Sequence, residues 1–195
     1  MDVAAMVLTG GASRRMGRCK ATLPIGWTTL AARTAALVAT IAEPVVEVGP
    51  GHSGAPFVMD ALPAAGPLAA IATGLAWLGG QGWTGPVIVV ATDLPCLSVE
   101  FLAHLAAHPA PGSVVPLDAG GRPQPLCARY SPGDLATAQM LVASGQRAMS
   151  VLLEAVTDIA YVDVTGWAAA EPDVLVDADT PDDWAALVGP GVVDK

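Results

Sequence analysis

Residues 4–11 read AAMVLTGG: five apolar residues, one threonine and two adjacent glycines. An apolar run without alternation is typical of a strand that is covered on both faces. Two glycines directly after such a strand allow the main chain to turn its amide groups toward a ligand. The segment therefore predicts a central, buried strand of an α/β sheet. Its loop should bind a ligand, because open α/β sheets collect ligands beyond the carboxyl ends of their strands.

The rest of the chain alternates short apolar runs with longer alanine-rich stretches, which favours strands alternating with helices. Residues 87–91, VIVVA, are the clearest further strand and end in Thr92-Asp93-Leu94-Pro95. We expect other strands at 45–48, 57–59, 113–116, 124–130 and 159–164, and helices at 28–40, 68–78, 99–107, 134–143, 149–155 and 181–187. No repeat or linker divides the chain, so we expect one domain over residues 1–188 and a frayed tail over 189–195.

The composition fits a protein that folds alone and does not bind polyanions. Of its 195 residues, 53% are hydrophobic, and 18 acidic against 9 basic residues give a formal net charge of -9. That charge repels nucleic-acid phosphates and anionic lipids. The most apolar stretch, 66–80, is shorter than the roughly 20 residues of a membrane-spanning helix. Cys19, Cys96 and Cys127 form no CxxC pair, which argues against a disulfide framework or a zinc site. We expect a cytoplasmic protein.

The loop after the first strand holds four of the nine basic residues of the chain: Arg14, Arg15, Arg18 and Lys20. Cationic side chains beside Gly10 and Gly11 predict an anion cradle, for which phosphate is the obvious ligand. The loop has neither the Gly-Lys-Ser/Thr of a Walker motif nor the spacing G-x-G-x-x-G, so an ordinary P-loop NTPase or dehydrogenase is not supported. The alternative is a solvated basic turn.

Two acidic positions could complete such a site. Asp93 follows the strand 87–91, and a single carboxylate together with substrate phosphates is the usual way to hold Mg²⁺. Its alternative is a turn cap before Pro95. Asp179 precedes Thr180-Pro181-Asp182-Asp183, which by itself is a sound helix start without any function.

The sequence offers no set of residues for acyl transfer. His52, His104 and His108 lie outside these loops, and no serine lies in a nucleophile elbow. A phosphate nucleophile needs no general base, because it is already ionised at neutral pH. The absence is therefore compatible with transfer between phosphates.

Residues 8–20, LTGGASRRMGRCK, resemble the L-A-G-G-x-S-x-R-M-G-x-D-K signature of the MobA-like nucleotidyltransferases. Within that family the chain resembles the molybdenum cofactor guanylyltransferases, because further segments follow in the family's order. These are Asp60 shortly before Gly66-Pro67-Leu68-Ala69, then Asp93-Leu94-Pro95, Arg122-Pro123-Gln124-Pro125-Leu126 running into Tyr130, and Asp179-Thr180-Pro181.

The resemblance implies a three-layer α/β/α, Rossmann-like fold with a mostly parallel sheet. It also implies Mg²⁺-dependent transfer of GMP from GTP to the terminal phosphate of molybdopterin cofactor, with release of pyrophosphate. The implied catalytic residues are Arg15, Lys20 and Asp93. The implied nucleotide contacts are Leu8, Thr9, Gly10, Gly11, Lys20, Asp60 and Asp93, the pterin contacts Arg122, Gln124 and Arg147, and the metal ligands Asp93 and Asp179. Implied partners are GTP, molybdopterin cofactor and, transiently, cofactor-synthesis proteins or client molybdenum enzymes.

The chain departs from the family pattern in the loop and at two other places. Cys19 replaces the acid before the lysine, and Thr9 replaces an alanine. Val48 and Gly49 stand where a polar, base-reading residue is expected, and Asp179 stands where the family often has asparagine. Two alternatives therefore stay open: a related nucleotidyltransferase that uses CTP or another phosphorylated acceptor, and a catalytically weak chaperone that binds the cofactor.

Overall fold

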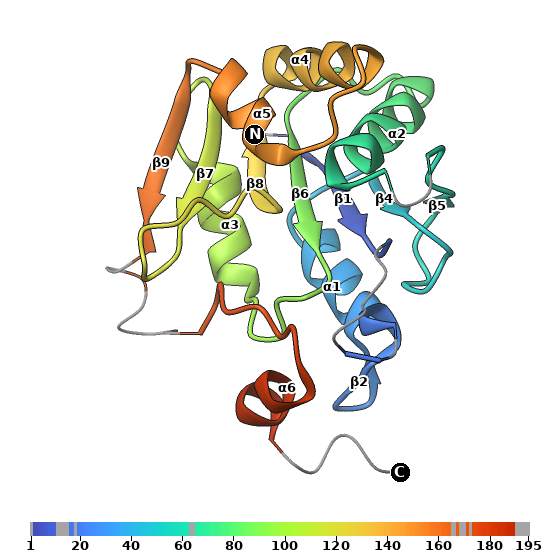
Figure 1. Ribbon diagram of the computed structural model, residues 1–195, viewed down its shortest axis with the longest axis vertical. Coiled ribbons are helices and arrows are strands. Elements are labelled where there is room, and N and C mark those ends of the chain that lie inside the picture. The colour runs from blue at the N-terminus through green and yellow to red at the C-terminus, as the bar shows by residue number, and fades with distance from the viewer. Residues whose placement is uncertain are drawn as a thin grey trace.

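The computed structural model describes residues 2–10, 16–17, 19–62, 65–164, 167, 171 and 173–189. Within these residues seven strands form one sheet in the order β5-β4-β1-β6-β8-β7-β9 (Figure 1). Their bounds are β1 (Ala4–Leu8), β4 (Val45–Val48), β5 (Phe57–Val58), β6 (Val87–Ala91), β7 (Ser113–Leu117), β8 (Cys127–Tyr130) and β9 (Ile159–Asp163). β8 runs antiparallel to β6 and β7, and the other paired strands are parallel. The expectation of a mostly parallel sheet is confirmed.

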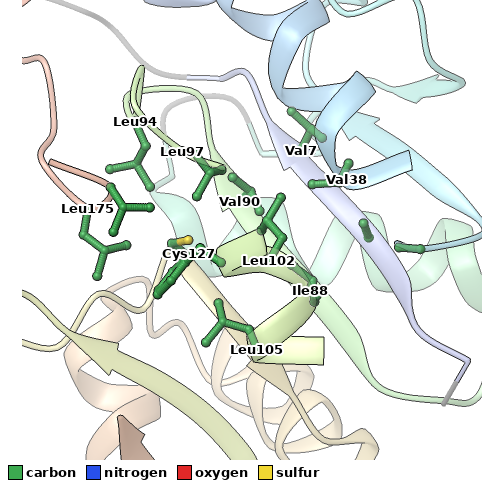
Figure 2. Packing of buried hydrophobic residues seen from close by; sticks show 14 of the residues in the cluster. Val7, Val38, Ile88, Val90, Leu94, Leu97, Leu102, Leu105, Cys127 and Leu175 are labelled. Atoms are coloured by element: carbon green, nitrogen blue, oxygen red, sulfur yellow. The ribbon is translucent and has the colours of Figure 1, made fainter. Parts of the chain in front are cut away.

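Helices cover both faces of the sheet, which gives three layers (Figure 1). The helices of the described residues are α1 (Leu30–Ala39), α2 (Pro67–Gly80), α3 (Val99–Ala107), α4 (Pro132–Ala143), α5 (Met149–Ala155) and α6 (Pro181–Val188). Successive side chains of a strand point to opposite faces. Accordingly, Ala5 and Val7 of β1 pack with α1 and α3 (Figure 2), whereas Ala4 and Met6 pack with α2, α4 and α5.

The central strands match the sequence prediction because burial alone determines them. β1 and β6 have the predicted bounds, and all ten of their residues are buried. They are hydrogen-bonded in register from Ala4 opposite Val87 to Leu8 opposite Ala91. The loops that follow Leu8 and Ala91 therefore leave the sheet side by side.

A small hairpin that the sequence did not predict follows the glycine loop. The 3-10 turn η1 (Lys20–Thr22) leads into β2 (Pro24–Ile25), which pairs with β3 (Thr28–Thr29). As a result α1 begins at residue 30 rather than 28, and the Thr29 side chain caps it by accepting a hydrogen bond from the amide of Ala32. Strands of two residues carry no periodicity, so only their tertiary contacts reveal them.

The strand predicted at 124–130 begins only at Cys127. The amide of Gln124 donates to the carbonyl of Pro116 (2.8 Å), and the amide of Cys127 donates to the carbonyl of Gln124 (3.1 Å). This turn replaces the first part of the expected strand and carries residues 122–126 past the end of β7.

A third apolar cluster attaches the C-terminal segment to this end of the molecule. It contains Met16, Leu23, Leu30, Ala178 and Trp184, so α6 packs on η1 and the start of α1. No helix among the described residues is long and apolar enough to cross a bilayer. Residues 190–195, most of the expected frayed tail, lie outside the described residues.

Candidate active site

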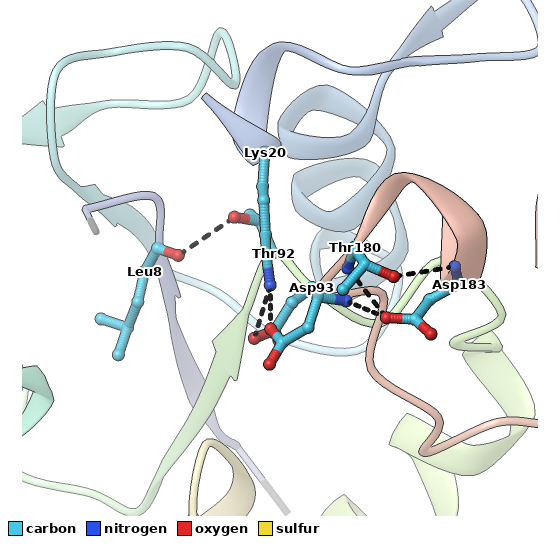
Figure 3. Close-up of polar contacts among 7 residues, drawn as sticks. Leu8, Lys20, Thr92, Asp93, Thr180 and Asp183 are labelled. Atoms are coloured by element: carbon cyan, nitrogen blue, oxygen red, sulfur yellow. Dashed lines mark hydrogen bonds and ion pairs between the residues drawn. The ribbon is translucent and has the colours of Figure 1, made fainter. Parts of the chain in front are cut away.

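One lysine and two aspartates from distant parts of the chain meet beside the carboxyl ends of β1 and β6. Nζ of Lys20 forms an ion pair with Oδ1 of Asp179 and lies 3.9 Å from Oδ2 of Asp93. Figure 3 shows the lysine side chain reaching from the turn after β1 toward the carboxylate of Asp93. The Lys20 side chain is only 15% exposed, against 32% for Asp93 and 38% for Asp179. The three groups therefore form a partly buried cluster with one open side.

Hydrogen bonds to main-chain carbonyls hold this cluster in place. Thr92 of the β6 loop donates its hydroxyl to the carbonyl of Leu8 (3.3 Å), which ties the two strand ends together. The carbonyl of Asp93 accepts a hydrogen bond from the amide of Ala178 (2.8 Å), which brings Asp179 to the same place.

The segment after Asp179 forms the predicted helix start. Thr180 and Asp183 make a capping box at the N-terminus of α6 (Figure 3). Oδ2 of Asp183 accepts hydrogen bonds from the amides of Thr180 (2.8 Å) and Asp179 (3.1 Å). These contacts confirm the helix-start interpretation for residues 180–183. They leave the side chain of Asp179 directed to Lys20, which a helix start alone does not require.

The electrostatics of the cluster favour a cation. Burial raises the pKa of Asp93, the neighbouring Lys20 ammonium lowers it, and the carboxylates of Asp177 and Asp179 raise it further, so that the pKa lies above its ordinary value. Carboxylate oxygens are donors that suit Mg²⁺. In the described ranges, however, no three His, Cys, Asp or Glu side chains gather closely enough to hold a metal by themselves. Asp93 and Asp179 could therefore hold a divalent cation only together with further ligands, such as oxygens of a bound phosphate chain.

A cleft of about 370 Å³ is lined by Asp93 of this cluster and by residues 122–126. Its lining combines the carboxylates of Asp93 and Asp177 with Arg122, Gln124 and Leu126. The structure thus brings Arg122 and Gln124, two of the predicted pterin contacts, to the same cleft as Asp93. Their roles stay predictions.

Asp118 shapes the turn that presents these two residues. Its Oδ2 accepts hydrogen bonds from Nε of Arg122 (2.9 Å) and Nε2 of Gln124 (3.0 Å). Its Oδ1 accepts from the amides of Gly120 and Arg122, and the hydrogen bonds lower the pKa of Asp118. The Arg122 side chain remains 78% exposed, so it is oriented and still accessible to a ligand.

Arg147, the third predicted pterin contact, is directed elsewhere in this structure. Its Nη1 donates to the carbonyls of Val142 (2.8 Å) and Gln146 (2.6 Å), at the end of α4. The guanidinium therefore satisfies carbonyls at a helix C-terminus. Its main chain lies against Gly66, where an added Cβ would be 3.1 Å from the carbonyl oxygen of Arg147.

The structure describes some of the predicted nucleotide contacts and not others. Leu8 and Thr9 are buried at the end of β1, and Gly10 is exposed directly after them. Asp60 follows β5, and its Oδ1 accepts a hydrogen bond from the amide of Leu62 (3.1 Å). Gly11 and Arg15 lie outside the described residues, as do Arg14 and Arg18. The nucleotide contacts of all these residues stay predictions.

Sequence reasoning missed Glu47, a buried carboxylate beside Thr9. It accepts hydrogen bonds from the Thr9 hydroxyl and from three main-chain amides of the loop after β4. The signal was a charged residue inside the otherwise apolar strand VVEV. Such a residue is rarely buried without dedicated partners.

Comparisons with known proteins agree with this arrangement. The sequence model described as "MobA-like NTP transferase domain" matches residues 5–159. The chain belongs to the MobA-like NTP transferase family. Relatives named "Probable molybdenum cofactor guanylyltransferase" come from Mycobacterium tuberculosis, 37% identical over 80% of this chain and 81% of the relative, and from Mycobacterium avium, 36% identical over 80% and 82%. As a member of this family, the protein is a nucleotidyltransferase.

Solved structures extend the likeness of this family member to the whole fold. Molybdopterin-guanine dinucleotide biosynthesis protein A from Archaeoglobus fulgidus has a TM-score of 0.71 at 23% identity, covering 94% of this chain and 95% of that one. The 2-C-methyl-D-erythritol 4-phosphate cytidylyltransferase from Thermus thermophilus has a TM-score of 0.64 at 20% identity, covering 95% and 97%. The expected Rossmann-like nucleotidyltransferase fold is confirmed.

Proposed function

We propose that this protein is a Mg²⁺-dependent guanylyltransferase of the cytoplasm. It transfers GMP from GTP to the terminal phosphate of molybdopterin cofactor and releases pyrophosphate. The single observation that carries the proposal is the cluster of Lys20, Asp93 and Asp179, of which Asp93 lines the same cleft as Arg122 and Gln124. The names of the mycobacterial relatives support guanine as the base and molybdenum cofactor as the acceptor.

The reaction forms one P–O bond and breaks another. A terminal phosphate oxygen of the acceptor attacks the α-phosphorus of GTP, the bond from that phosphorus to the oxygen bridging to the β-phosphate breaks, and pyrophosphate leaves with the electron pair. No side chain has to remove a proton, because the acceptor phosphate is ionised at neutral pH. Positioning and charge neutralisation therefore account for the catalysis.

The residues of the cluster divide this work. Lys20 exchanges its contact with the carboxylates for the phosphate oxygens of GTP, where its ammonium neutralises charge that builds up in the transition state. Asp93 and Asp179 would hold Mg²⁺, which when bound supplies Lewis-acid neutralisation of substrate oxygens. Leu8, Thr9, Gly10 and Gly11 offer main chain to the nucleotide.

Other predicted residues serve the two ends of the reaction. Arg15 joins Lys20 at the phosphates, and Asp60 contacts the guanine. Arg122 and Gln124 hold the terminal phosphate side of the pterin, and Arg147 reaches it by exchanging its hydrogen bonds to the carbonyls of Val142 and Gln146. After transfer, the dinucleotide cofactor passes to client molybdenum enzymes through transient protein contacts.

The proposal is tested with purified protein, Mg²⁺, molybdopterin cofactor and either GTP or CTP. We expect pyrophosphate release with GTP, dependent on the cofactor, and a product whose mass is that of the cofactor plus GMP. Chelation of Mg²⁺ with EDTA should stop the release, and the Asp93→Ala variant should be inactive while retaining the wild-type circular dichroism spectrum. Pyrophosphate release with CTP but not with GTP would indicate a cytidylyltransferase. Cofactor binding without release would indicate a chaperone, and either result overturns the proposal.

A further inference from the structure

Glu47 is a fully buried carboxylate in β4, at 0% exposure, in register with Val7 of the central strand β1. A buried ionised carboxylate costs several kcal/mol unless hydrogen bonds replace its lost water. Glu47 has such replacements. Its Oε1 accepts hydrogen bonds from Oγ1 of Thr9 (2.5 Å) and from the amides of Gly51 (2.9 Å) and His52 (2.8 Å). Its Oε2 accepts from the amide of Ser53 (2.7 Å).

These bonds keep Glu47 charged inside the fold. Burial raises the pKa of Glu47, but hydrogen bonds from Ser53, Thr9 and His52 lower it more, and the pKa lies below its ordinary value. The carboxylate is therefore an anion at neutral pH. It holds the amides of residues 51–53 and the hydroxyl of Thr9 together.

The network joins the end of β1 to residues 49–53, which we call the β4 loop. The amide of Thr9 also donates to the carbonyl of Val48 (3.1 Å). At Gly49, with φ of 149°, an added Cβ would lie 2.1 Å from Oγ1 of Thr9, so position 49 cannot carry a side chain. Val48 is itself buried. Neither residue can therefore reach a ligand with a polar side chain, and the β4 loop meets the end of β1 through its main chain.

The order of the strands indicates on which side of β1 the nucleobase would lie. β1 stands between β4 and β6. On the β6 side are Asp93, Lys20 and the cleft lined by residues 122–126, which the proposed function assigns to the phosphates and the acceptor. A nucleoside attached to those phosphates must extend away from the acceptor. The side of β1 that remains for the base is the side of the β4 loop.

We propose that Glu47 is a positioning residue for the nucleobase. By holding the β4 loop against Thr9, it fixes the main-chain wall along which the base lies, without touching the nucleotide itself. The inference rests on the proposed function for the direction of the nucleotide. It assigns a role in base binding and discrimination to Glu47 and to the Thr9 hydroxyl, and none in the phosphate chemistry of Lys20 and Asp93.

The test compares Thr9→Val, which removes the hydroxyl that donates to Glu47, with the control Thr34→Val, which removes a buried hydroxyl that donates to the carbonyl of Leu30 in α1. Calorimetry measures the Kd of GTP and of ATP without acceptor, and the transfer assay gives kcat and KM. We expect Thr9→Val to weaken GTP binding and raise its KM about tenfold, since a hydrogen bond to a charged group is lost. The preference for GTP over ATP should fall, with KM affected more than kcat, and Thr34→Val, at a residue outside the site, should behave as the wild type. If Glu47→Gln folds, its GTP affinity, KM and base preference should match those of Thr9→Val.

A purely structural role would lower the melting temperature and leave base preference unchanged. The inference is therefore overturned if folded Thr9→Val retains the GTP affinity and base preference of the wild type and of Thr34→Val. Failure of the proposed function looks different, because the wild-type protein itself would then not transfer GMP. If the wild type binds CTP instead, the same pair of variants is compared with CTP.

Discussion

Nζ of Lys20 and Oδ2 of Asp93 lie 3.9 Å apart although α1, β4, β5, α2 and β6 separate them in the chain. Parallel pairing explains the meeting. Leu8 and Ala91 are register partners in β1 and β6, so the loops that follow them leave the sheet at one point. Any nucleotide held by the glycine loop is thereby placed within reach of an acid from the next strand.

Lys20→Met should reduce GMP transfer by about 10²–10³-fold, the loss typical of removing one preorganised group that stabilises transition-state charge. Asp179→Asn keeps Lys20 and an oxygen ligand, so we expect its kcat to stay within about tenfold of the wild type. Both values come from the initial rate of pyrophosphate release at saturating GTP. Wild-type turnover of Lys20→Met would remove this residue from the catalytic set.

Asp93→Asn should stabilise the fold while abolishing transfer. Because burial raises the pKa of Asp93, the folded protein binds this proton more tightly than the unfolded chain does. Ionisation therefore costs stability; the cost is absent below the unfolded-state pKa and complete once the pH exceeds the folded-state pKa. We expect the melting temperature of Asp93→Asn at pH 7 to be higher by about 2–4 °C, the shift per kcal/mol for a domain of this size. The difference should shrink as the pH falls toward 4.

Asp118 provides a control for that pH profile, because replacing it by asparagine should change the melting temperature at pH 7 in the opposite direction. Hydrogen bonds, first that from the Arg122 amide, lower its pKa, so ionised Asp118 stabilises the fold above the unfolded-state pKa. Asp118→Asn should therefore melt below the wild type at pH 7, and the two should converge as the pH falls through the folded-state pKa. If Asp93→Asn and Asp118→Asn shift in the same direction at pH 7, the electrostatic account of the cluster is wrong.

Two glycines of α2 should respond oppositely to alanine. At Gly74 a Cβ would lie 2.7 Å from Sδ of Met6 and 2.9 Å from Cγ2 of Val48, both buried, whereas at Gly79 it would meet no described atom within 4 Å. Gly74→Ala should lower the free energy of unfolding by about 1–3 kcal/mol through overpacking. Gly79→Ala should raise it by about 0.5–1 kcal/mol through helix propensity. Urea unfolding measures both, and equal shifts would contradict the close packing of α2 on β1 and β4.

Much of the fold could be predicted because burial leaves a mark on composition. β1, β4, β6, α3 and α5 have the predicted bounds. Apart from the buried Glu47 of β4, their runs are apolar on the faces that the sheet and helices cover. The β2–β3 hairpin and the turn at Gln124 could not be predicted, since contacts with distant main chain determine them. The antiparallel direction of β8 likewise depends on where the loop from β7 returns.

For the site, the sequence indicated which residues matter more readily than which contacts they make. Lys20, Asp93 and Asp179 were singled out by charge and position, and the structure brings them together. Their chemical roles stay predictions. The hydrogen bonds of Arg147 at the end of α4 and of Glu47 in the β4 loop could not be predicted, because each joins a side chain to main-chain groups whose orientation appears only in the folded chain.

The cluster of Lys20, Asp93 and Asp179 also depends on the order in which the chain is synthesised. Lys20 is made early, whereas the segment that carries Asp179 follows 159 residues later and docks on Asp93 through the Ala178 amide. Both apolar clusters of the sheet are complete by residue 175. A chain still emerging from the ribosome, or one clipped by a protease just before Asp177, would therefore keep the sheet's core and lack Asp179 altogether. Loss of this short segment should therefore weaken the site and uncover Leu23 and Leu30, which pack on Trp184, while the apolar clusters on the two faces of the sheet stay covered.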